Sequence, residues 1–271
     1  MTRIYPVRLD WELARRGYRR YAAYPGATYA GLFTNVVFGF LIAYILLAVY
    51  EQADAIGGYD VRDAIAYVWL SQGLLAVVGV FGAGWYELAR RVQTGDVATD
   101  LQRPLDVQRA ELAQDLGRAG YQVLWRALPQ FALGALVFEI TIPGEPGRWL
   151  LFALSVALAV LVSFGIRFLV NLASFWLLDY RGPVVLAIAV NLLLSGAVMP
   201  LAFFPGWLDT ATRLTPFASM LQAPVDVYVG APVGGSTALV LALQILWVLV
   251  LYGTGRYVLA AGTRKLVVQG G

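Results

Sequence analysis

The residue types that carry out most enzymatic chemistry are missing from this sequence. It contains no histidine and no cysteine, which excludes zinc or haem sites built on those ligands, thiol nucleophiles and histidine acid–base catalysis. Its only lysine, Lys265, follows Thr263 and Arg264 without the glycine frame of a phosphate-binding Walker loop. We therefore expect no catalytic residue, and no metal or cofactor bound by this chain.

Charged and amide side chains within the apolar segments are the remaining candidates for chemistry, because such groups in a membrane are functional candidates by default. Glu139 and Arg167 are predicted about 6 Å and about 28 Å from the outer ends of their helices, so we expect no direct ion pair between them. Each can extend to its nearer interface. The uncharged polar positions, which we expect to form interhelical hydrogen bonds or to line a cavity, are Asn35, Gln72, Asn171, Asn191 and Gln244. The candidate path residues are Asn35, Gln72, Glu139, Arg167 and Asn191.

The elements that must position these groups are transmembrane helices. Of 271 residues, 59% are apolar and only 14% are charged, against roughly 25% charged in soluble domains. A crossing needs about 20 apolar residues, and the sequence offers six candidates, at 29–50, 64–86, 127–142, 149–178, 183–203 and 237–258. The third is the weakest, because Arg126 and Pro143 bracket it and Glu139 lies inside it. We find no internal repeat or linker, so residues 1–271 are predicted to form one membrane domain.

Positive charge predicts the orientation. Fifteen Arg and Lys residues fall in the segments 1–27, 87–126, around Arg181 and after residue 258, whereas three, Arg62, Arg148 and Arg213, fall in the opposite loops. Basic residues stay in the cytoplasm. Both termini are therefore predicted to be cytoplasmic, in the cytoplasmic membrane.

Residues 1–27 contain six arginines and no apolar core of a removable signal peptide. Their apolar positions recur at helical spacing with arginines on the other faces, which is typical of an amphipathic helix in the membrane interface. A helix that merely sets topology is the alternative. These positions are Val7, Trp11, Ala14, Tyr18 and Tyr21.

The loop 87–126 is the largest predicted cytoplasmic feature. Gly95 and the run 101–106, with Pro104 near its first turn, predict a turn that leads into a short helix. Beyond it, an apolar stripe is predicted to form a docking surface, the alternative being a solvated connection. The stripe is Leu105, Leu112, Leu116 and Val123, and the charged residues expected to face elsewhere are Arg109, Glu111, Asp115 and Arg118.

The segment 197–232 is rich in proline yet too apolar for a free loop. We expect re-entrant or interfacial short helices on the outer side, with an aromatic belt loop as the alternative. The apolar helical face expected there is Trp207, Ala211, Leu214, Ala218 and Leu221.

Taken together, these features resemble the permeases of type-2 ABC exporters. The resemblance covers nearly the whole chain and depends on two ordered patterns, Gly95 … Leu101-x-Arg103-Pro104-Leu105 and Gly196 … Pro200-Leu201 … Phe204-Pro205-Gly206-Trp207-Leu208 … Leu214-x-Pro216-Phe217. The large extracellular domain of some relatives is absent. The fold that the resemblance implies is an all-α integral membrane protein with six transmembrane helices, an amphipathic interface helix, a cytoplasmic coupling helix and outer re-entrant helices.

The resemblance implies that the coupling residues dock on a separate ATPase: Arg103, Pro104, Leu105, Asp106, Arg109 and Leu112. The outer gate that it implies comprises Pro200, Phe204, Pro205, Trp207, Pro216 and Phe217. ATP and Mg would then be held by the partner, and two ATPases would require a second permease, identical or related. We expect an amphiphilic exported substrate, such as a drug, an antibiotic or a lipid-like molecule, and no nucleic-acid partner.

The absence of a carboxylate pair in the middle of the membrane argues against a proton- or sodium-coupled carrier. A secondary carrier or channel, and a membrane-embedded enzyme or structural protein, remain the alternatives to a permease. The sequence does not discriminate a homodimer from a heterodimer, and export rather than import depends on the resemblance.

Overall fold

Prolines and glycines divide the apolar sequence into helices, and the computed structural model describes residues 7–102, 105–177, 179–230 and 236–265. Pro25 and Pro146 each lie in the first turn of a long helix, where the missing amide hydrogen costs nothing. The described residues contain no strand, only an isolated bridge between Ile56 and Tyr59. The predicted all-α class is therefore confirmed.

The α-helices are α1 (Val7–Ala22), α2 (Pro25–Tyr50), α3 (Val61–Val77), α4 (Glu87–Gln93), α5 (Val97–Gln102), α6 (Val107–Gln122), α7 (Leu128–Val137), α8 (Pro146–Leu172), α9 (Arg181–Leu194), α10 (Gly206–Arg213), α11 (Gln222–Val229) and α12 (Thr237–Thr263). Short turns connect some of them: η1 (Ala83–Trp85), the π-helical η2 (Val123–Ala127), η3 (Ala173–Phe175) and η4 (Leu201–Phe203).

Three helical stretches among the described residues are long and apolar enough to span a membrane. They are Pro25–Tyr50, Pro146–Phe175 and Thr237–Thr263, and Arg181–Leu194 is a shorter apolar helix. Few residues of α2 are buried, and its large side chains Phe33, Phe38 and Leu41 are exposed. Such an apolar surface matches lipid or a membrane partner rather than water.

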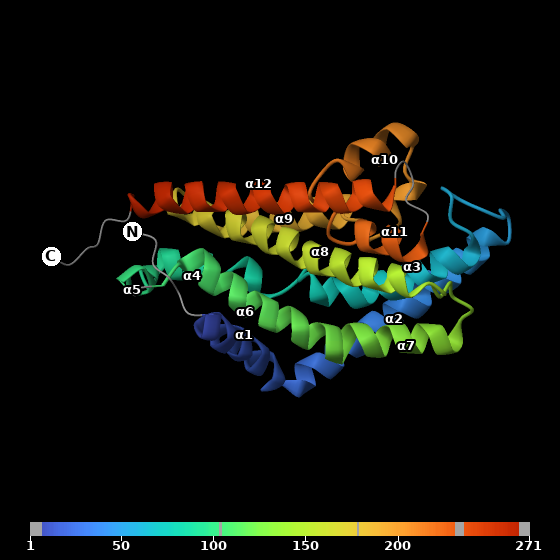
Figure 1. Cartoon of the computed structure of the whole chain (residues 1–271), viewed down its shortest axis with the longest axis horizontal. Helices are drawn as coiled ribbons and strands as arrows, with labels where there is room; N and C mark the ends of the chain where they lie inside the picture. Colours follow the sequence, from blue (N-terminus) through green and yellow to red (C-terminus); the bar gives the residue numbers. More distant parts are fainter. Residues whose placement is uncertain (1–6, 103–104, 178, 231–235, 266–271) are drawn as a thin grey trace.

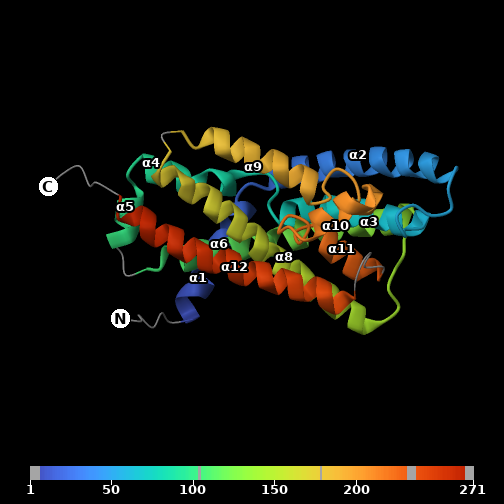
Figure 2. The ribbon, with the colours of Figure 1, turned by 90° about the horizontal axis from the view of Figure 1, so that it is seen from above.

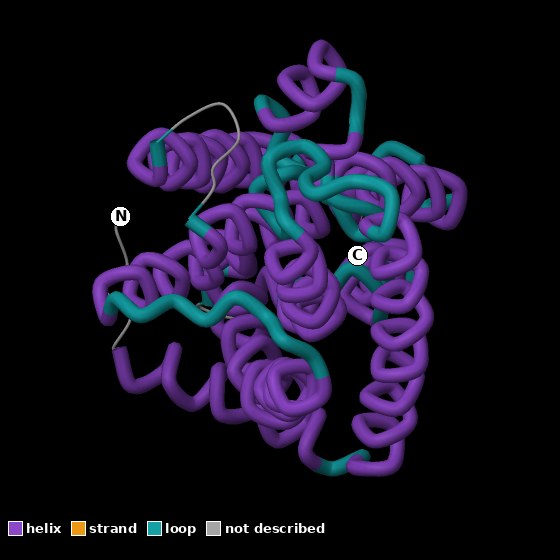
Figure 3. Tube along the Cα trace, turned by 90° about the vertical axis from the view of Figure 1, so that its right-hand side faces the viewer, coloured by secondary structure: helices purple, strands orange, loops and turns teal. Residues whose placement is uncertain are grey.

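The long helices lie along the long axis of the molecule (Figures 1 and 2). α1, α4, α5 and the end of α12 lie at one end, which we call the α5 end. α10, α11 and the connection between α2 and α3 lie at the other, which we call the α11 end (Figure 1). Seen from the α11 end, loops lie over the helix bundle (Figure 3).

Glycines allow the closest helix crossings. A Cβ at Gly117 of α6 would lie 1.8 Å from the Ala14 carbonyl oxygen of α1, and one at Gly17 would lie 2.0 Å from the Gln114 carbonyl oxygen of α6. In the centre, Gly134 of α7 leaves room for the indole of Trp69, which is fully buried on α3. Side chains larger than hydrogen at these contacts would separate the helices.

Several predicted helix bounds are wrong. In the range 64–86 the α-helix ends at Val77 because two glycines with positive φ, Gly79 and Gly82, follow it, and only the short turn η1 comes after them. α9 ends at Leu194, well before residue 203.

The third predicted span differs in a further way. α6, η2 and α7 follow one another without a gap from 107 to 137, so the helix of the predicted loop continues into the predicted span (Figure 1). Glu139 lies beyond the end of α7 instead of inside a helix.

Candidate functional site

α3 ends within the helix bundle, and we call the non-helical residues 78–82 that follow it the interruption after α3. Side chains from other helices stabilise both the end of α3 and this interruption. The last carbonyls of a helix lack partners in that helix, and here Arg118 of α6 donates to the carbonyls of Ala76 at 2.7 Å and Val77 at 2.9 Å. A guanidinium in this position also complements the negative end of the helix dipole. The residues after α3 receive similar bonds, from Ser163 to the Val78 carbonyl and from Trp85 Nε1 to the Val80 carbonyl at 2.8 Å.

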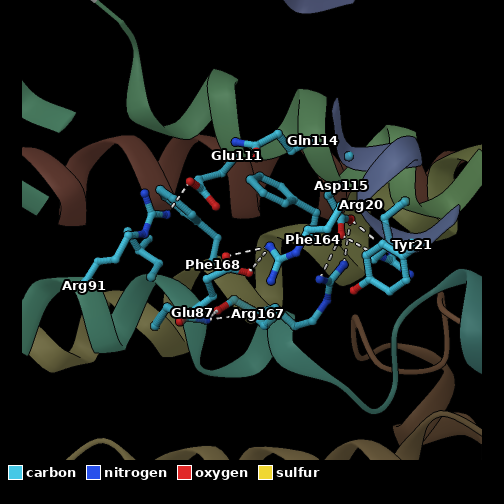
Figure 4. A pocket seen from close by; sticks show the side chains of 15 residues that line it. Arg20, Tyr21, Glu87, Arg91, Glu111, Gln114, Asp115, Phe164, Arg167 and Phe168 are labelled. Carbon is cyan, nitrogen blue, oxygen red and sulfur yellow. Dashed lines mark hydrogen bonds and ion pairs between the residues drawn. The ribbon is translucent and has the colours of Figure 1, made fainter. Parts of the chain in front are cut away.

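Beside this interruption, Asp115 binds two arginines. Arg118 Nε lies 2.7 Å from Asp115 Oδ1, and Arg167 of α8 places Nη1 3.1 Å from Oδ1 and Nη2 2.7 Å from Oδ2. All three side chains are less than 10% exposed. We call these three residues the arginine–aspartate triad (Figure 4).

The triad changes the charge state expected of a buried carboxyl. Burial opposes ionisation of Asp115, but the charges and hydrogen bonds of Arg167 and Arg118 outweigh burial and lower the pKa of Asp115 well below its usual range. The triad is therefore an ionised cluster with one more positive than negative charge. A cluster of this kind links α6, α8 and the end of α3.

Two further arginines extend the charged cluster toward α1 and α4. Arg20 of α1 binds Glu87 of α4 at 2.6 Å, and Arg91 of α4 binds Asp100 at 2.5 Å and also Glu111 of α6. Burial raises the pKa of Glu111, and the charge and hydrogen bond of Arg91 offset part of that rise. Together with the triad, four of these residues line a cavity of about 170 Å³ between α1, α4, α6 and α8, namely Arg20, Glu87, Arg91 and Glu111 (Figure 4).

The triad corrects one prediction. Arg167 does not extend to an interface, because its side chain is 5% exposed and binds Asp115. Asp115 and Arg118 lie on a different face of α6 from Leu116, as predicted, and that face is buried whereas Leu116 is 44% exposed. A buried carboxylate requires cationic partners, and only the packing of α8 against α6 supplies the second one.

The predicted coupling residues that the structure describes lie at the α5 end. Arg103 and Pro104 lie outside the described residues, and Leu105 is half-buried. Asp106 caps α6 by accepting from the Arg109 amide at 3.0 Å and also binds Arg256 of α12. Arg109 binds Asp10 of α1.

The remaining coupling residue, Leu112, packs beside a small cluster of buried apolar side chains formed by Leu88, Val92, Val97, Val107, Phe164, Phe168 and Leu172. The start of α6 is therefore anchored to α1, α12 and α4. The exposed part of this end is the turn between α4 and α5 together with the end of α5, around Gly95, Thr99 and Leu101.

At the α11 end, a buried polar network fixes the segment predicted as the outer gate. All eight residues of α11 are buried. Gln222 Nε2 lies 2.9 Å from the Tyr59 hydroxyl and 2.7 Å from Asp226 Oδ1, and its Oε1 accepts from the Leu201 amide at 2.8 Å. Tyr59 and Arg213 both donate to Asp226. Tyr67 of α3 donates to the Gly196 carbonyl, so α3 also contacts the start of the segment 196–229.

The predicted gate residues are distributed over this segment instead of meeting at one point. Pro200 is buried before η4, Phe204 is half-buried and Pro205 is exposed before α10. Trp207 is 74% exposed. Pro216 and Phe217 are half-buried in the turn that precedes α11.

The apolar face predicted for this segment points the other way. α10 buries its polar Asp209 and Thr212, while Trp207, Ala211 and Leu214 are exposed. Ala218 and Leu221 of the predicted face lie beyond α10 and are buried. This orientation suits a helix at a lipid interface, where the apolar face contacts lipid and polar groups need partners inside the protein.

The polar positions predicted within spans have different roles. Asn35 of α2 donates to the Gln72 carbonyl of α3 at 2.9 Å, and Gln244 of α12 donates to the carbonyls of Ser155 and Ser219. Asn171 caps α4 by accepting from the Ala89 amide at 2.8 Å. Asn191 is fully buried without a hydrogen bond to either amide atom.

Glu139 binds Arg62 at 2.8 Å in an exposed pair at the α11 end. The expectation that it does not pair with Arg167 is confirmed by their separate partners.

Sequence reasoning missed Tyr59, Tyr67 and Gln222 as functional candidates. Each is a common buried residue type, and nothing in its local spacing marks it. A signal was available for Asp115, since a carboxylate on a helix with small residues at Ala113, Gly117 and Ala119 suits close packing. That signal does not identify the partner.

Among the described residues, no group of three or more His, Cys, Asp or Glu side chains could hold a metal ion. Comparison with known proteins gives one family. A family model described as ABC-2 family transporter protein matches residues 34–270. No curated protein matches the chain. The match includes the last two thirds of α2, from residue 34 to Tyr50, and every later helix, and α1 precedes it.

Proposed function

Since the match to the ABC-2 family transporter proteins covers most of its length, the chain belongs to this family of membrane permeases, and we propose that it is the permease subunit of an ATP-driven exporter. The family match carries this proposal. ABC-2 permeases generally lack an ATPase site of their own and work with ABC ATPase partners. We infer that a separate polypeptide here binds ATP and Mg, and that a second permease, identical or related, completes the complex.

We propose that the chain crosses the cytoplasmic membrane six times, through α2, α3, η2 continued by α7, α8, α9 and α12, with α6 on the cytoplasmic side. The order of colours along the helices in Figure 1 supports alternating chain directions for these six segments. α3 has 17 residues, about 26 Å of helix, and α9 has 14, about 21 Å. Both are shorter than a hydrocarbon layer of ~30 Å, so local thinning of the bilayer accompanies these crossings.

Charge supports an orientation with the α5 end in the cytoplasm. Arg181 and Arg264, at the start of α9 and the end of α12, belong to this end, together with the arginines of α1 and α4. Arg62, Arg148 and Arg213, at the start of α3, the start of α8 and in α10, belong to the other. Under the positive-inside rule both termini are cytoplasmic.

Coupling to the ATPase is assigned to the turn between α5 and α6 and to the exposed end of α5. Asp106 and Arg109 connect this region to α12 and α1, so a force applied to the turn reaches the bundle through ion pairs and a continuous helix. Export of an amphiphilic molecule fits the apolar surfaces of the long helices and follows the resemblance to exporters.

Leu105→Asp tests the proposal. Loss of an apolar anchor at an interface costs about 2 kcal/mol or more, roughly a thirtyfold loss of affinity. We expect the variant to insert and fold but to lose co-purification of the ATPase and substrate-stimulated ATP hydrolysis in a reconstituted complex. Leu177→Asp is the control, because Leu177 is also outside a helix, is 42% exposed, and lies in the connection between α8 and α9 and not in the predicted docking stripe.

Two outcomes count against the proposal. Full ATPase binding by Leu105→Asp would show that another segment couples the two subunits. If no ATPase associates with the unmodified protein, a secondary carrier or channel becomes the better interpretation.

A further inference from the structure

A second cavity adjoins the triad and shares Arg118 and Arg167 with the 170 Å³ cavity. It has a volume of about 510 Å³ and extends between α1, the start of α2, the interruption after α3, and α6. Two aromatic side chains at its edge, Tyr24 and Phe81, are 71% and 59% exposed. The cavity is therefore open at its rim, near the α1–α2 corner.

The lining of this cavity carries positive charge only. Four arginines line it, Arg20, Arg118, Arg126 and Arg167, and none of its described lining residues is acidic. Glu87 and Asp115, which pair with three of these arginines, line the 170 Å³ cavity instead. The single carboxylate of Asp115 pairs with both Arg118 and Arg167, so these ion pairs leave one unbalanced positive charge at the larger cavity.

Arg126 adds a charge that no carboxylate balances. Among the described residues no carboxylate forms an ion pair with it, and its buried Nε has no hydrogen-bond partner. One helical turn earlier, the buried Oε1 of Gln122 also lacks a partner. The guanidinium lies against Gly31 of α2, where a Cβ would be 2.7 Å from Nη2. Arg126 is half-buried, and a cation withdrawn from water without a partner is costly unless an anion is bound.

We propose that this cavity binds a phosphate group, and that the source is the headgroup of an anionic lipid. Guanidinium groups form paired, charge-assisted hydrogen bonds with phosphate oxygens, and Arg126 has free donors for them. A lipid also accounts for the rim, because tyrosine and phenylalanine contact glycerol and acyl chains at the membrane interface. This site does not depend on the proposed transport function.

The test measures binding to the purified full chain in a neutral detergent by isothermal titration calorimetry. Three probes separate the sources: dioctanoyl phosphatidylglycerol, dioctanoylglycerol, which has the same tails without phosphate, and inorganic phosphate. We expect the phospholipid to bind most tightly, inorganic phosphate to bind more weakly and dioctanoylglycerol not to bind at this site.

Arg126→Gln should weaken phospholipid binding roughly tenfold or more, which is the effect of losing a charged hydrogen-bonding partner. Arg126→Lys keeps the charge and should retain part of the affinity. Arg62→Gln is the matched control, because it removes one positive charge from an exposed ion pair at the α11 end. It should bind like the unmodified protein.

Gly31→Ala provides a second route if Arg126→Gln does not fold. The added methyl group displaces only the far end of the Arg126 side chain, so the fold should persist while binding weakens. Equal binding of inorganic phosphate and phospholipid, with the same loss in Arg126→Gln, would support the phosphate site and assign it to a free anion. Binding of dioctanoylglycerol as tight as the phospholipid, or affinities unaffected by both Arg126→Gln and Gly31→Ala, would overturn the proposal.

Discussion

Replacement of Asp115 by asparagine tests whether the arginine–aspartate triad holds α6, α8 and the end of α3 together. Asp115 receives four N–O contacts between 2.7 and 3.3 Å from two arginines. Neither arginine can turn away to water, because Arg118 also binds two carbonyls of α3 and Arg167 binds Ser163. In Asp115→Asn, two buried cations face a neutral amide whose NH2 group cannot accept a hydrogen bond.

The magnitude follows from this geometry. Loss of one partner from a buried ion pair costs about 3–5 kcal/mol, and each kcal/mol lowers Tm by about 2–4 °C in a chain of this size. We therefore expect Asp115→Asn to lower Tm by roughly 10 °C. Arg167→Gln should cost less, about 1–3 kcal/mol, because Asp115 and Arg118 remain paired.

Thermal unfolding of the purified protein in detergent, followed by tryptophan fluorescence, measures both effects. Adding Arg167→Gln to Asp115→Asn removes one of the two unpaired cations, so the double variant should be more stable than the sum of the single effects predicts. Glu139→Gln is the control, since its exposed pair with Arg62 contributes at most about 1 kcal/mol. If Asp115→Asn and Glu139→Gln shift Tm equally, the reasoning about the triad is wrong.

Three further predictions follow from single contacts. Gly117→Ala should destabilise the protein by about 1–3 kcal/mol and expose α1 to protease, because its Cβ would lie 1.8 Å from the Ala14 carbonyl oxygen. Gly120→Ala should have neither effect, because a Cβ there would meet nothing within 4 Å. Equal protease sensitivity of the two variants would refute the close crossing of α1 and α6. Tyr59→Phe should lower the stability by about 1–3 kcal/mol, since it removes a buried hydroxyl that donates to Asp226 and accepts from Gln222, and an unchanged Tm would argue against the network. The folded-state pKa of Asp115 is depressed, so the stability that its carboxylate contributes is fully present above its unfolded-state pKa of about 4 and is lost as the pH falls through its folded-state pKa. The Tm difference between the unmodified protein and Asp115→Asn should therefore stay constant from pH 8 to about 5 and shrink only below that. A Tm difference that fades near neutral pH would contradict the sign of the pKa shift.

The sequence predicts less of the candidate site than of the fold. Spacing alone identified Arg167 as an unusual charge but assigned it to an interface, because a helix read in isolation offers no acidic partner. Its partner is 52 residues away, on a helix predicted to be part of the cytoplasmic loop 87–126. Arg126 likewise marked only the edge of a span in the sequence, and its position beside Gly31 emerges from the packing of η2 against α2.

The sequence by itself determined that this chain is helical and apolar enough for a membrane, and it placed the three long helices α2, α8 and α12 to within about six residues at each end, because those properties depend on local runs of side chains. The tertiary structure decided where α3 stops, which face of α10 is buried, and that Asp115 lies between two arginines. The physical reason is that lipid and protein interior are equally apolar, so a local pattern cannot tell which of the two an apolar face contacts. Polar groups such as Asp115 and Asp209 then occupy whichever positions the packed helices supply with partners, and those partners are distant in sequence.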